Sequence, residues 1–202
     1  MDAAGRADVT APLTQEAARL ICDERLIDYA AAKRKAVQRL GLGAHTALPD
    51  NASVREAVIA YQRMFGGDAY REHLRAMRQT ALRAMELLKD FSPRLVGGAA
   101  NGAVTSANRV QLHVFDDQAE APELFLLNRN IVCTQGQRRY RYADGREQDI
   151  ALTRFEGDGI GVDVAVFSWD AQRRAPLDPS GNSSYQRLDA DAVRALLAAD
   201  NG

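Results

Sequence analysis

Apolar side chains recur at intervals of three or four residues through the first 89 positions of the chain. One stripe runs through Val54, Val58, Tyr61 and Phe65, and a longer one contains Tyr70, Leu74, Met77, Ala81, Met85 and Leu88. This spacing places the apolar side chains on one face of a helix. The pattern predicts four helices in this part of the chain, the longest over residues 68–89.

Polar residues and glycines suggest where these helices begin and end. Thr14 and Asp28 are suitable N-cap residues for the first two helices, and residues 53–56 (Ser-Val-Arg-Glu) fit a capping box for the third. Gly41 is placed to end the second helix in a left-handed conformation.

After Ser92-Pro93 the apolar pattern changes from helical spacing to alternation. Short alternating or apolar runs predict strands at residues 94–97, 110–115, 138–142, 150–155 and 161–167, with helices at 121–130 and, after Asp189, at 193–198. Asp144-Gly145 is a hairpin signal. We therefore predict an α+β fold: a helical N-terminal region (1–92) packed on a small mixed sheet with a C-terminal helix (93–202).

Composition and charge exclude several classes of protein but do not identify a function. The 202 residues carry a net charge of −1, so long-range electrostatics do not favour nucleic acid or anionic lipid as partners. No apolar run approaches the roughly 20 residues of a membrane helix, and no signal peptide is recognisable. Cys22 and Cys133 are too far apart for a metal or redox motif. A cytoplasmic protein without a membrane partner is expected.

One segment carries most of the functional information. Residues 95–96 end a strand, Gly97-Gly98 follow, Gly102 comes four residues later, and Asn108-Arg109-Val110-Gln111 enter the next strand. This arrangement resembles the core motif of the DNA polymerase β-like nucleotidyltransferases in their minimal bacterial form. That family has Gly-Ser, a glycine four residues on, and then Ser-Asp-x-Asp.

The resemblance implies a sheet of nucleotidyltransferase type and a site whose acidic residues have been replaced. In the family, the serine and the following helix face the nucleotide phosphates, and the two aspartates hold divalent metal ions with a third carboxylate from a later strand. Here Gly98 replaces the serine, while Arg109 and Gln111 replace the aspartates. Asp163 matches the third carboxylate, and an ion pair with Arg109 is expected where the metal would otherwise lie.

The expected function is therefore that of a degenerate, non-catalytic member that binds a nucleotide or phosphate ligand. No catalytic residue, metal ligand or cofactor is assigned. The expected ligand-binding residues share the old active-site cleft; they are Gly97, Gly98, Gly102, Arg109, Gln111, His113 and Asp163.

Other interpretations remain open at the level of sequence. The glycines can simply shape a strand-to-helix turn. An active, magnesium-dependent transferase would need other carboxylates, such as Asp116 and Asp117. A protein-interaction module would use the helices at 53–65 and 68–89. The basic run at residues 138–141 is compatible with nucleic-acid binding, although such runs more often form a solvated edge strand.

Overall fold

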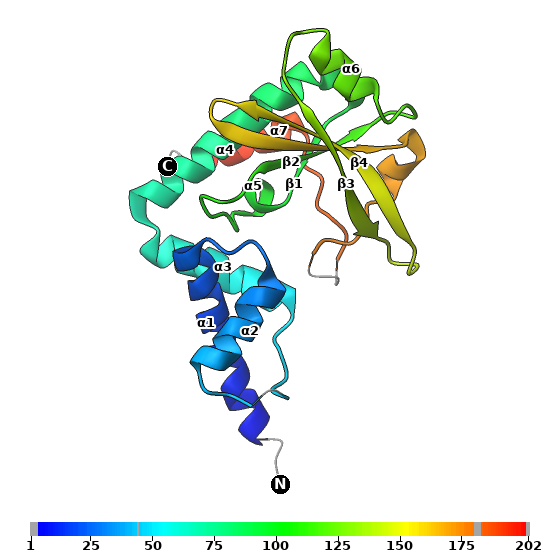
Figure 1. The fold of residues 1–202 in the computed structure, drawn as a ribbon. Helices are drawn as coiled ribbons and strands as arrows, with labels where there is room; N and C mark the ends of the chain where they lie inside the picture. The colour runs from blue at the N-terminus through cyan, green and yellow to red at the C-terminus, as the bar shows by residue number, and fades with distance from the viewer. Residues whose placement is uncertain (1–3, 44, 180–182, 201–202) are drawn as a thin grey trace. The chain divides into compact units, whose positions relative to one another are not determined.

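A computed structural model describes residues 4–43, 45–179 and 183–200, and its backbone is drawn in Figure 1. These residues form seven α-helices and a five-stranded mixed sheet, which confirms the predicted α+β class. The chain divides into two compact units. The helical unit comprises Met1–Arg71 and Ala103–Asn108, and the sheet unit comprises Glu72–Gly102 and Arg109–Gly202. The change from helices to strands near residue 92 therefore lies inside the sheet unit.

Three helices build the helical unit: α1 (Ala4–Glu24), α2 (Tyr29–Arg39) and α3 (Asn51–Phe65). Their apolar stripes meet in one core, formed by Leu13, Ala17, Ala18, Leu20, Ile21, Ala32, Ala36, Val54 and Val58. The segment Ala103–Asn108 belongs to this unit, and the Gln62 side chain donates a hydrogen bond to the Val104 carbonyl (3.0 Å).

Of the starts predicted for the first three helices, one is confirmed and two are wrong. Asp28 caps α2 by accepting a hydrogen bond from the Ala30 amide (2.7 Å). Thr14 lies inside α1, which begins further upstream, and its hydroxyl donates to the Thr10 carbonyl (2.8 Å). The N-cap of α3 is Asp50, whose carboxylate accepts from the Ser53 amide (2.7 Å). An aspartate one turn earlier therefore takes the capping role predicted for the serine.

The sheet has the strand order β1-β2-β5-β4-β3. The strands are β1 (Arg94–Val96), β2 (Val110–Phe115), β3 (Thr134–Arg141), β4 (Glu147–Gly157) and β5 (Ile160–Phe167). The β2–β5 pair is parallel and the other pairs are antiparallel. Between the strands lie the short helices α5 (Gly98–Asn101) and α6 (Ala121–Leu127).

Two helices lie against one face of this sheet, α4 (Gly67–Leu87) and α7 (Ala190–Ala199), as Figure 1 shows. The predicted apolar stripe of the longest helix is buried, with Leu74, Met77, Ala81, Met85 and Leu88 all less than 9% exposed. Arg78 fixes this layer: it donates to the Ala99 carbonyl (3.0 Å) and pairs with Asp200 (2.6 Å). The stripe is thus part of the core of the sheet unit.

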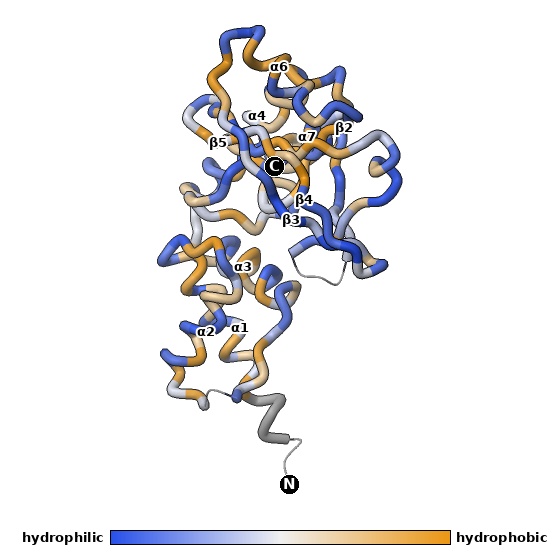
Figure 2. Tube along the Cα trace, turned by 45° about the vertical axis from the view of Figure 1, so that its right-hand side comes forward, coloured by the Kyte–Doolittle hydropathy of each residue, from blue (hydrophilic) through white to orange (hydrophobic). Residues whose placement is uncertain are grey.

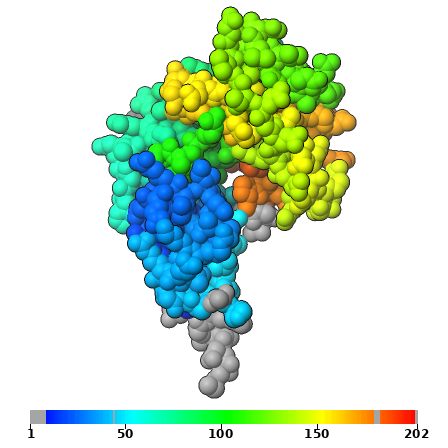
Figure 3. Space-filling model, viewed as in Figure 1, coloured from blue at the N-terminus to red at the C-terminus, as the bar shows by residue number. Residues whose placement is uncertain are grey.

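The opposite face of the sheet is only partly covered by protein. Part of it forms a second apolar cluster of Val96, Phe115, Tyr140, Ile150, Leu152, Ala165, Phe167 and Tyr185. Tyr185 comes from the segment between β5 and α7, and this segment covers that part of the face. Atoms of β3 and β4 are visible from the front in Figure 3, and β3 is largely hydrophilic in Figure 2. The uncovered part of this face holds the polar residues described next.

Two Asp-Gly turns set the strand registers. The turn at Asp144-Gly145 joins β3 to β4, as predicted. Asp158-Gly159 joins β4 to β5, and both residues have positive φ (53° and 75°). Since this conformation matches a type I′ hairpin, Gly159 belongs to a turn, while Gly157 and Gly161 lie in the flanking strands. No helix within residues 4–43, 45–179 and 183–200 is long and apolar enough to cross a membrane.

Candidate anion-binding site

The register of the central strands brings polar side chains together on the uncovered face. Gln111 on β2 lies beside Asp163 on β5, and Asp163 lies beside Arg154 on β4. Because side chains alternate across a strand, residues directly opposite one another share a face of the sheet. Arg138 on β3 reaches the same Asp163 carboxylate. With Arg109, described next, included, three arginines and one aspartate therefore meet on one surface.

Asp163 and Arg109 form the ion pair that the sequence led us to expect. Arg109 Nε donates to Asp163 Oδ1 at 2.6 Å. Its Nη2 also donates to the carbonyls of Phe155 (3.3 Å) and Val162 (3.4 Å). The guanidinium passes directly over Gly161, where a Cβ would overlap it. The absence of a side chain at 161 thus lets Arg109 lie across β5 to reach β4.

Two further arginines complete the surface around this carboxylate. Arg138 Nη2 donates to Asp163 Oδ2 at 3.0 Å, and Arg154 Nε lies 3.8 Å from Oδ1. Three guanidiniums against one carboxylate leave an excess of two positive charges. The Asp163 side chain is 6% exposed, whereas the side chains of Arg109, Arg138 and Arg154 are 38%, 32% and 39% exposed. The carboxylate is buried beneath cations that remain accessible to solvent.

The N–H groups of the Arg154 guanidinium are available as hydrogen-bond donors. Within the described part of the chain its guanidinium makes an ion pair with Asp163 but no hydrogen bond. It lies beside Gly136, where a Cβ would come within 2.8 Å of Nη1. A guanidinium that is accessible and not hydrogen-bonded is well suited to a phosphate or carboxylate ligand.

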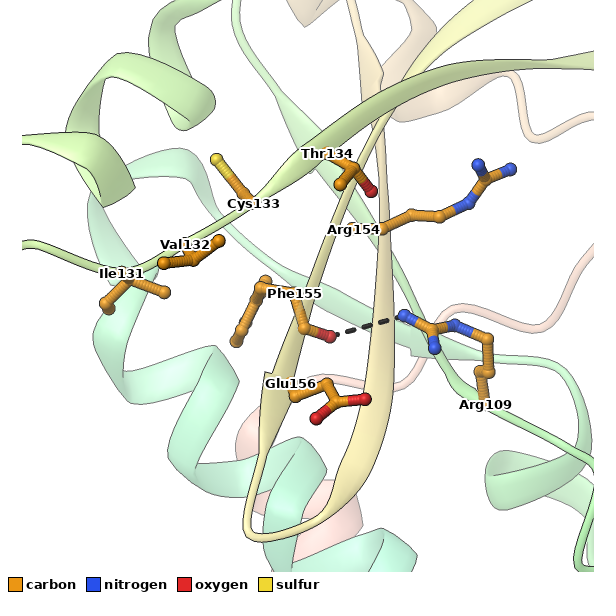
Figure 4. A pocket seen from close by; sticks show the side chains of 8 residues that line it. All are labelled: Arg109, Ile131, Val132, Cys133, Thr134, Arg154, Phe155 and Glu156. Atoms are coloured by element: carbon orange, nitrogen blue, oxygen red, sulfur yellow. Dashed lines mark hydrogen bonds between the residues drawn. The ribbon is translucent and has the colours of Figure 1, made fainter.

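A pocket of about 640 Å³ adjoins these arginines, and its lining side chains are drawn in Figure 4. Arg109, Arg154 and Glu156 supply its charged groups. Ile131, Val132, Cys133, Thr134 and Phe155 supply the rest of the lining. The volume lies within the range of about 300–1,000 Å³ that is typical of small-molecule sites.

Gly97, one of the three glycines predicted to bind ligand, lies beside Gln111 on this surface. Its φ is +72°, and a Cβ there would come within 2.8 Å of Gln111 Oε1. Gly97 and Gln111 are therefore packed together, as neighbours at the end of β1 and on β2. Gly98 begins α5 and Gly102 ends it with φ +89°. Because α5 has only four residues, its dipole adds little to the attraction for an anion.

His113 lies on the same strand face but is enclosed by protein. It is 1% exposed and is surrounded by the rings of Tyr140, Phe167 and Tyr185. Burial, followed by the charges of Arg187 and Arg138, lowers the pKa of His113 well below its usual value. Its Nδ1 accepts from Arg187 Nε (3.1 Å), while its buried Nε2 has no hydrogen-bond partner among the described residues. The structure thus separates His113 from the accessible arginines.

Arg187 belongs to this buried group too. Burial lowers its pKa to about 10. Its guanidinium lies over the rings of Phe115 and Phe167, and Nη1 donates to the carbonyls of Ala171 and Gln172. These contacts hold the segment after β5 against the sheet.

The residues on this face do not fit the magnesium ions that the active-enzyme hypothesis requires. Magnesium requires several oxygen ligands in near-octahedral geometry. Both oxygens of Asp163 accept from guanidiniums, and a third cation stands close by. Within the described residues no group of three His, Cys, Asp or Glu side chains is arranged to hold a metal ion. Asp116 and Asp117, the carboxylates of the active-enzyme hypothesis, instead accept backbone hydrogen bonds from Gln118 and Trp169.

The basic run at residues 138–141 does not form a continuous basic surface. Arg138 turns toward Asp163, while Arg139 pairs with Asp149 (2.9 Å) and Arg141 with Glu147 (3.4 Å). Tyr140, the aromatic residue of the run, is buried (4% exposed). The run is the outermost strand of the sheet, and its aromatic ring is not available to stack on a base.

Comparison of the chain with protein-family models, curated proteins and solved structures gives no match. The site therefore has to be interpreted from its own geometry. The structure brings together Arg109, Gln111 and Asp163, which were predicted from the sequence, with Arg154, which was not. Counting outward from the two-residue turn at Asp158-Gly159 places Arg154 opposite Asp163, so the signal was present in the turn.

Proposed function

We propose that this chain is a degenerate nucleotidyltransferase-like protein that binds a phosphate-bearing ligand without a metal ion. The observation that carries the proposal is the convergence of Arg109, Arg138 and Arg154 on the single carboxylate of Asp163. Arginine binds phosphate through paired, charge-assisted hydrogen bonds. Here the guanidiniums do what divalent metal does in the family that the motif resembles: they neutralise the ligand's negative charge.

The positions of the motif residues support the link to that family. Arg109 and Gln111 replace the two family aspartates, and Gln111 lies directly beside Asp163 in the sheet. The replaced positions and the retained carboxylate thus share one surface. Metal-dependent transfer has no suitable ligand set there, and binding is the activity proposed.

Isothermal titration calorimetry of the full chain with EDTA present tests the proposal. We expect pyrophosphate, ATP and GTP to bind without metal. Arg154→Ala should weaken pyrophosphate binding about tenfold, because one charge-assisted contact is lost. Arg139→Ala is the matched control on the same pair of strands, since Arg139 pairs only with Glu147 and Asp149 in the described structure.

Asp163→Asn separates this proposal from the active-enzyme hypothesis. Removing the carboxylate leaves the arginines without their internal counter-ion, so pyrophosphate should bind at least as tightly as before. A metal-dependent site would lose binding in this variant. Binding that requires magnesium, or no binding of any phosphate compound, would overturn the proposal.

An interaction surface on the N-terminal helices remains a prediction, and so does a cytoplasmic location. The apolar stripe of α4 is buried, so it does not provide such a surface. In the helical unit, Met64 and Phe65 at the end of α3 are 74% and 66% exposed. They are where a protein partner of these helices would be sought.

A further inference from the structure

The pocket beside the arginines has a defined position in the sheet. Pairing between β3 and β4 ends at Thr134 and Arg154, and β4 continues for three more residues. Phe155 and Glu156 therefore border a gap that the segment before β3 closes from the other side. In Figure 4, Ile131, Val132 and Cys133 stand on that side, opposite Arg109 and Arg154.

The charged groups of the pocket are of both signs. Arg109 and Arg154 are shared with the anion-binding surface. Glu156 is exposed, and its carboxylate makes no hydrogen bond or ion pair within the described residues. An ionised carboxylate can only accept hydrogen bonds, so it selects groups that donate. A complementary ligand carries an anionic group, an apolar body and an edge that donates hydrogen bonds.

We propose that the pocket holds the base of a nucleotide and that Glu156 selects guanine; the proposal rests on phosphate binding by the neighbouring arginines. Guanine presents two adjacent N–H donors, N1–H and the 2-amino group, which one carboxylate accepts together. Adenine presents an acceptor at N1 beside its single amino group, so the carboxylate faces a lone pair. The discrimination therefore includes a repulsive contribution against adenine.

Calorimetric titrations of the full chain in EDTA test this selectivity with four probes: GTP, ATP, ITP and pyrophosphate. GTP should bind about tenfold more tightly than ATP, as expected for the loss of a hydrogen bond to a charged group. ITP lacks the 2-amino group and should fall between them. Pyrophosphate measures the contribution of the arginines alone.

Glu156→Gln tests the residue itself. A glutamine amide presents a donor beside an acceptor, which match N1 and the 6-amino group of adenine as well as O6 and N1–H of guanine. The variant should lose the preference for GTP, so that ATP and GTP bind about equally. Pyrophosphate should bind at least as tightly as before, because a negative charge beside the arginines is removed. Glu147→Gln, at the far end of the same strand, is the control and should keep the preference.

Alkylation of Cys133 locates the ligand independently. Cys133 lines the pocket, whereas Cys22 lies on the core of the helical unit. GTP should slow modification of Cys133 by N-ethylmaleimide and leave Cys22 unaffected. Equal affinities for GTP and ATP with intact pyrophosphate binding would overturn guanine selection and leave the proposed function standing. Absence of all phosphate binding would overturn both proposals. An unaltered preference for GTP in Glu156→Gln would overturn the assignment of guanine selection to Glu156.

Discussion

At the scale of single residues, the position of Arg109 depends on Gly161, because its guanidinium occupies the space that a side chain at 161 would fill. Arg109 reaches Asp163, Phe155 and Val162 only because residue 161 is glycine. The far end of a flexible side chain can move aside at little cost. A side chain at 161 should therefore displace the guanidinium without unfolding the sheet.

Gly161→Ala should accordingly weaken pyrophosphate binding about fivefold while the arginine charge is retained, since one of the phosphate contacts is misplaced. Calorimetry measures the affinity, and thermal unfolding checks the fold. Adding Gly161→Ala to Arg109→Ala should have little further effect, because the displaced group is already absent. Two independent, additive losses would show that Gly161 does not act through Arg109.

His113 is the residue whose protonation should affect stability. Its pKa in the folded chain lies well below that in the unfolded chain, which takes up a proton near pH 6.5. Below that pH the unfolded chain binds the extra proton, so the free energy of unfolding falls with acidification, by up to about 1.4 kcal/mol per pH unit. Above it, His113 is neutral in both states and the effect is absent.

His113→Gln should remove this contribution and keep an acceptor for Arg187. Urea denaturation at pH 7.5 and 5.5 measures the difference. The unmodified chain should lose about 1 kcal/mol more stability than the variant over this interval. His45→Gln, at an exposed position, is the control. Identical losses in the unmodified chain and in His113→Gln would contradict the burial of a neutral imidazole.

At the scale of secondary structure, the hairpin between β4 and β5 decides which side chains meet at the site. Asp158 and Gly159 both adopt positive φ, so the turn has two residues and places Arg154 beside Asp163. Gly159 has open space around it, and only its backbone conformation opposes a side chain.

Gly159→Ala should therefore destabilise the fold by about 1 kcal/mol through backbone strain alone. Urea denaturation measures this loss. Gly43→Ala is the control, because Gly43 also has open space but no positive φ. An equal effect of both substitutions would mean that the left-handed turn is not required.

Much of the secondary structure could be predicted from spacing, whereas the relations between the strands could not. Alternation in Val110, Leu112 and Val114 predicted β2, and Asp144-Gly145 predicted one hairpin. The N-caps predicted for α1 and α3 were wrong because several nearby residues can cap a helix. The local sequence does not show which of them does. Arg154 was missed because its partner lies across a strand pairing that only the second turn defines.

At the scale of the whole molecule, the change of pattern near residue 92 does not mark a separable piece. The part of α4 from Glu72 onward belongs to the sheet unit, and its apolar face is buried. Thr80 lies close to Gly157 on β4, and Arg78 joins α4 to Ala99. A fragment that begins at residue 93 loses this layer and exposes the apolar face of the sheet.

A fragment of residues 93–202 should therefore show no cooperative unfolding transition and should aggregate, because strands such as β2 and β5 are left with uncovered apolar side chains. A fragment of residues 66–202, which retains all of α4, is the matched comparison and should unfold cooperatively. Circular dichroism during heating distinguishes the two. A stable 93–202 fragment would show that α4 is dispensable for the sheet.

The passage of Arg109 over Gly161 also has a consequence for how this surface can change over generations. A larger residue at 161 is costly while Arg109 is present, and glycine at 161 brings no benefit once Arg109 is gone. The two positions, 52 residues apart in the chain, should therefore covary among descendants of the same ancestor. Chains that carry an acidic residue at position 109 are expected to have a side chain at position 161, and chains with arginine there are expected to retain glycine.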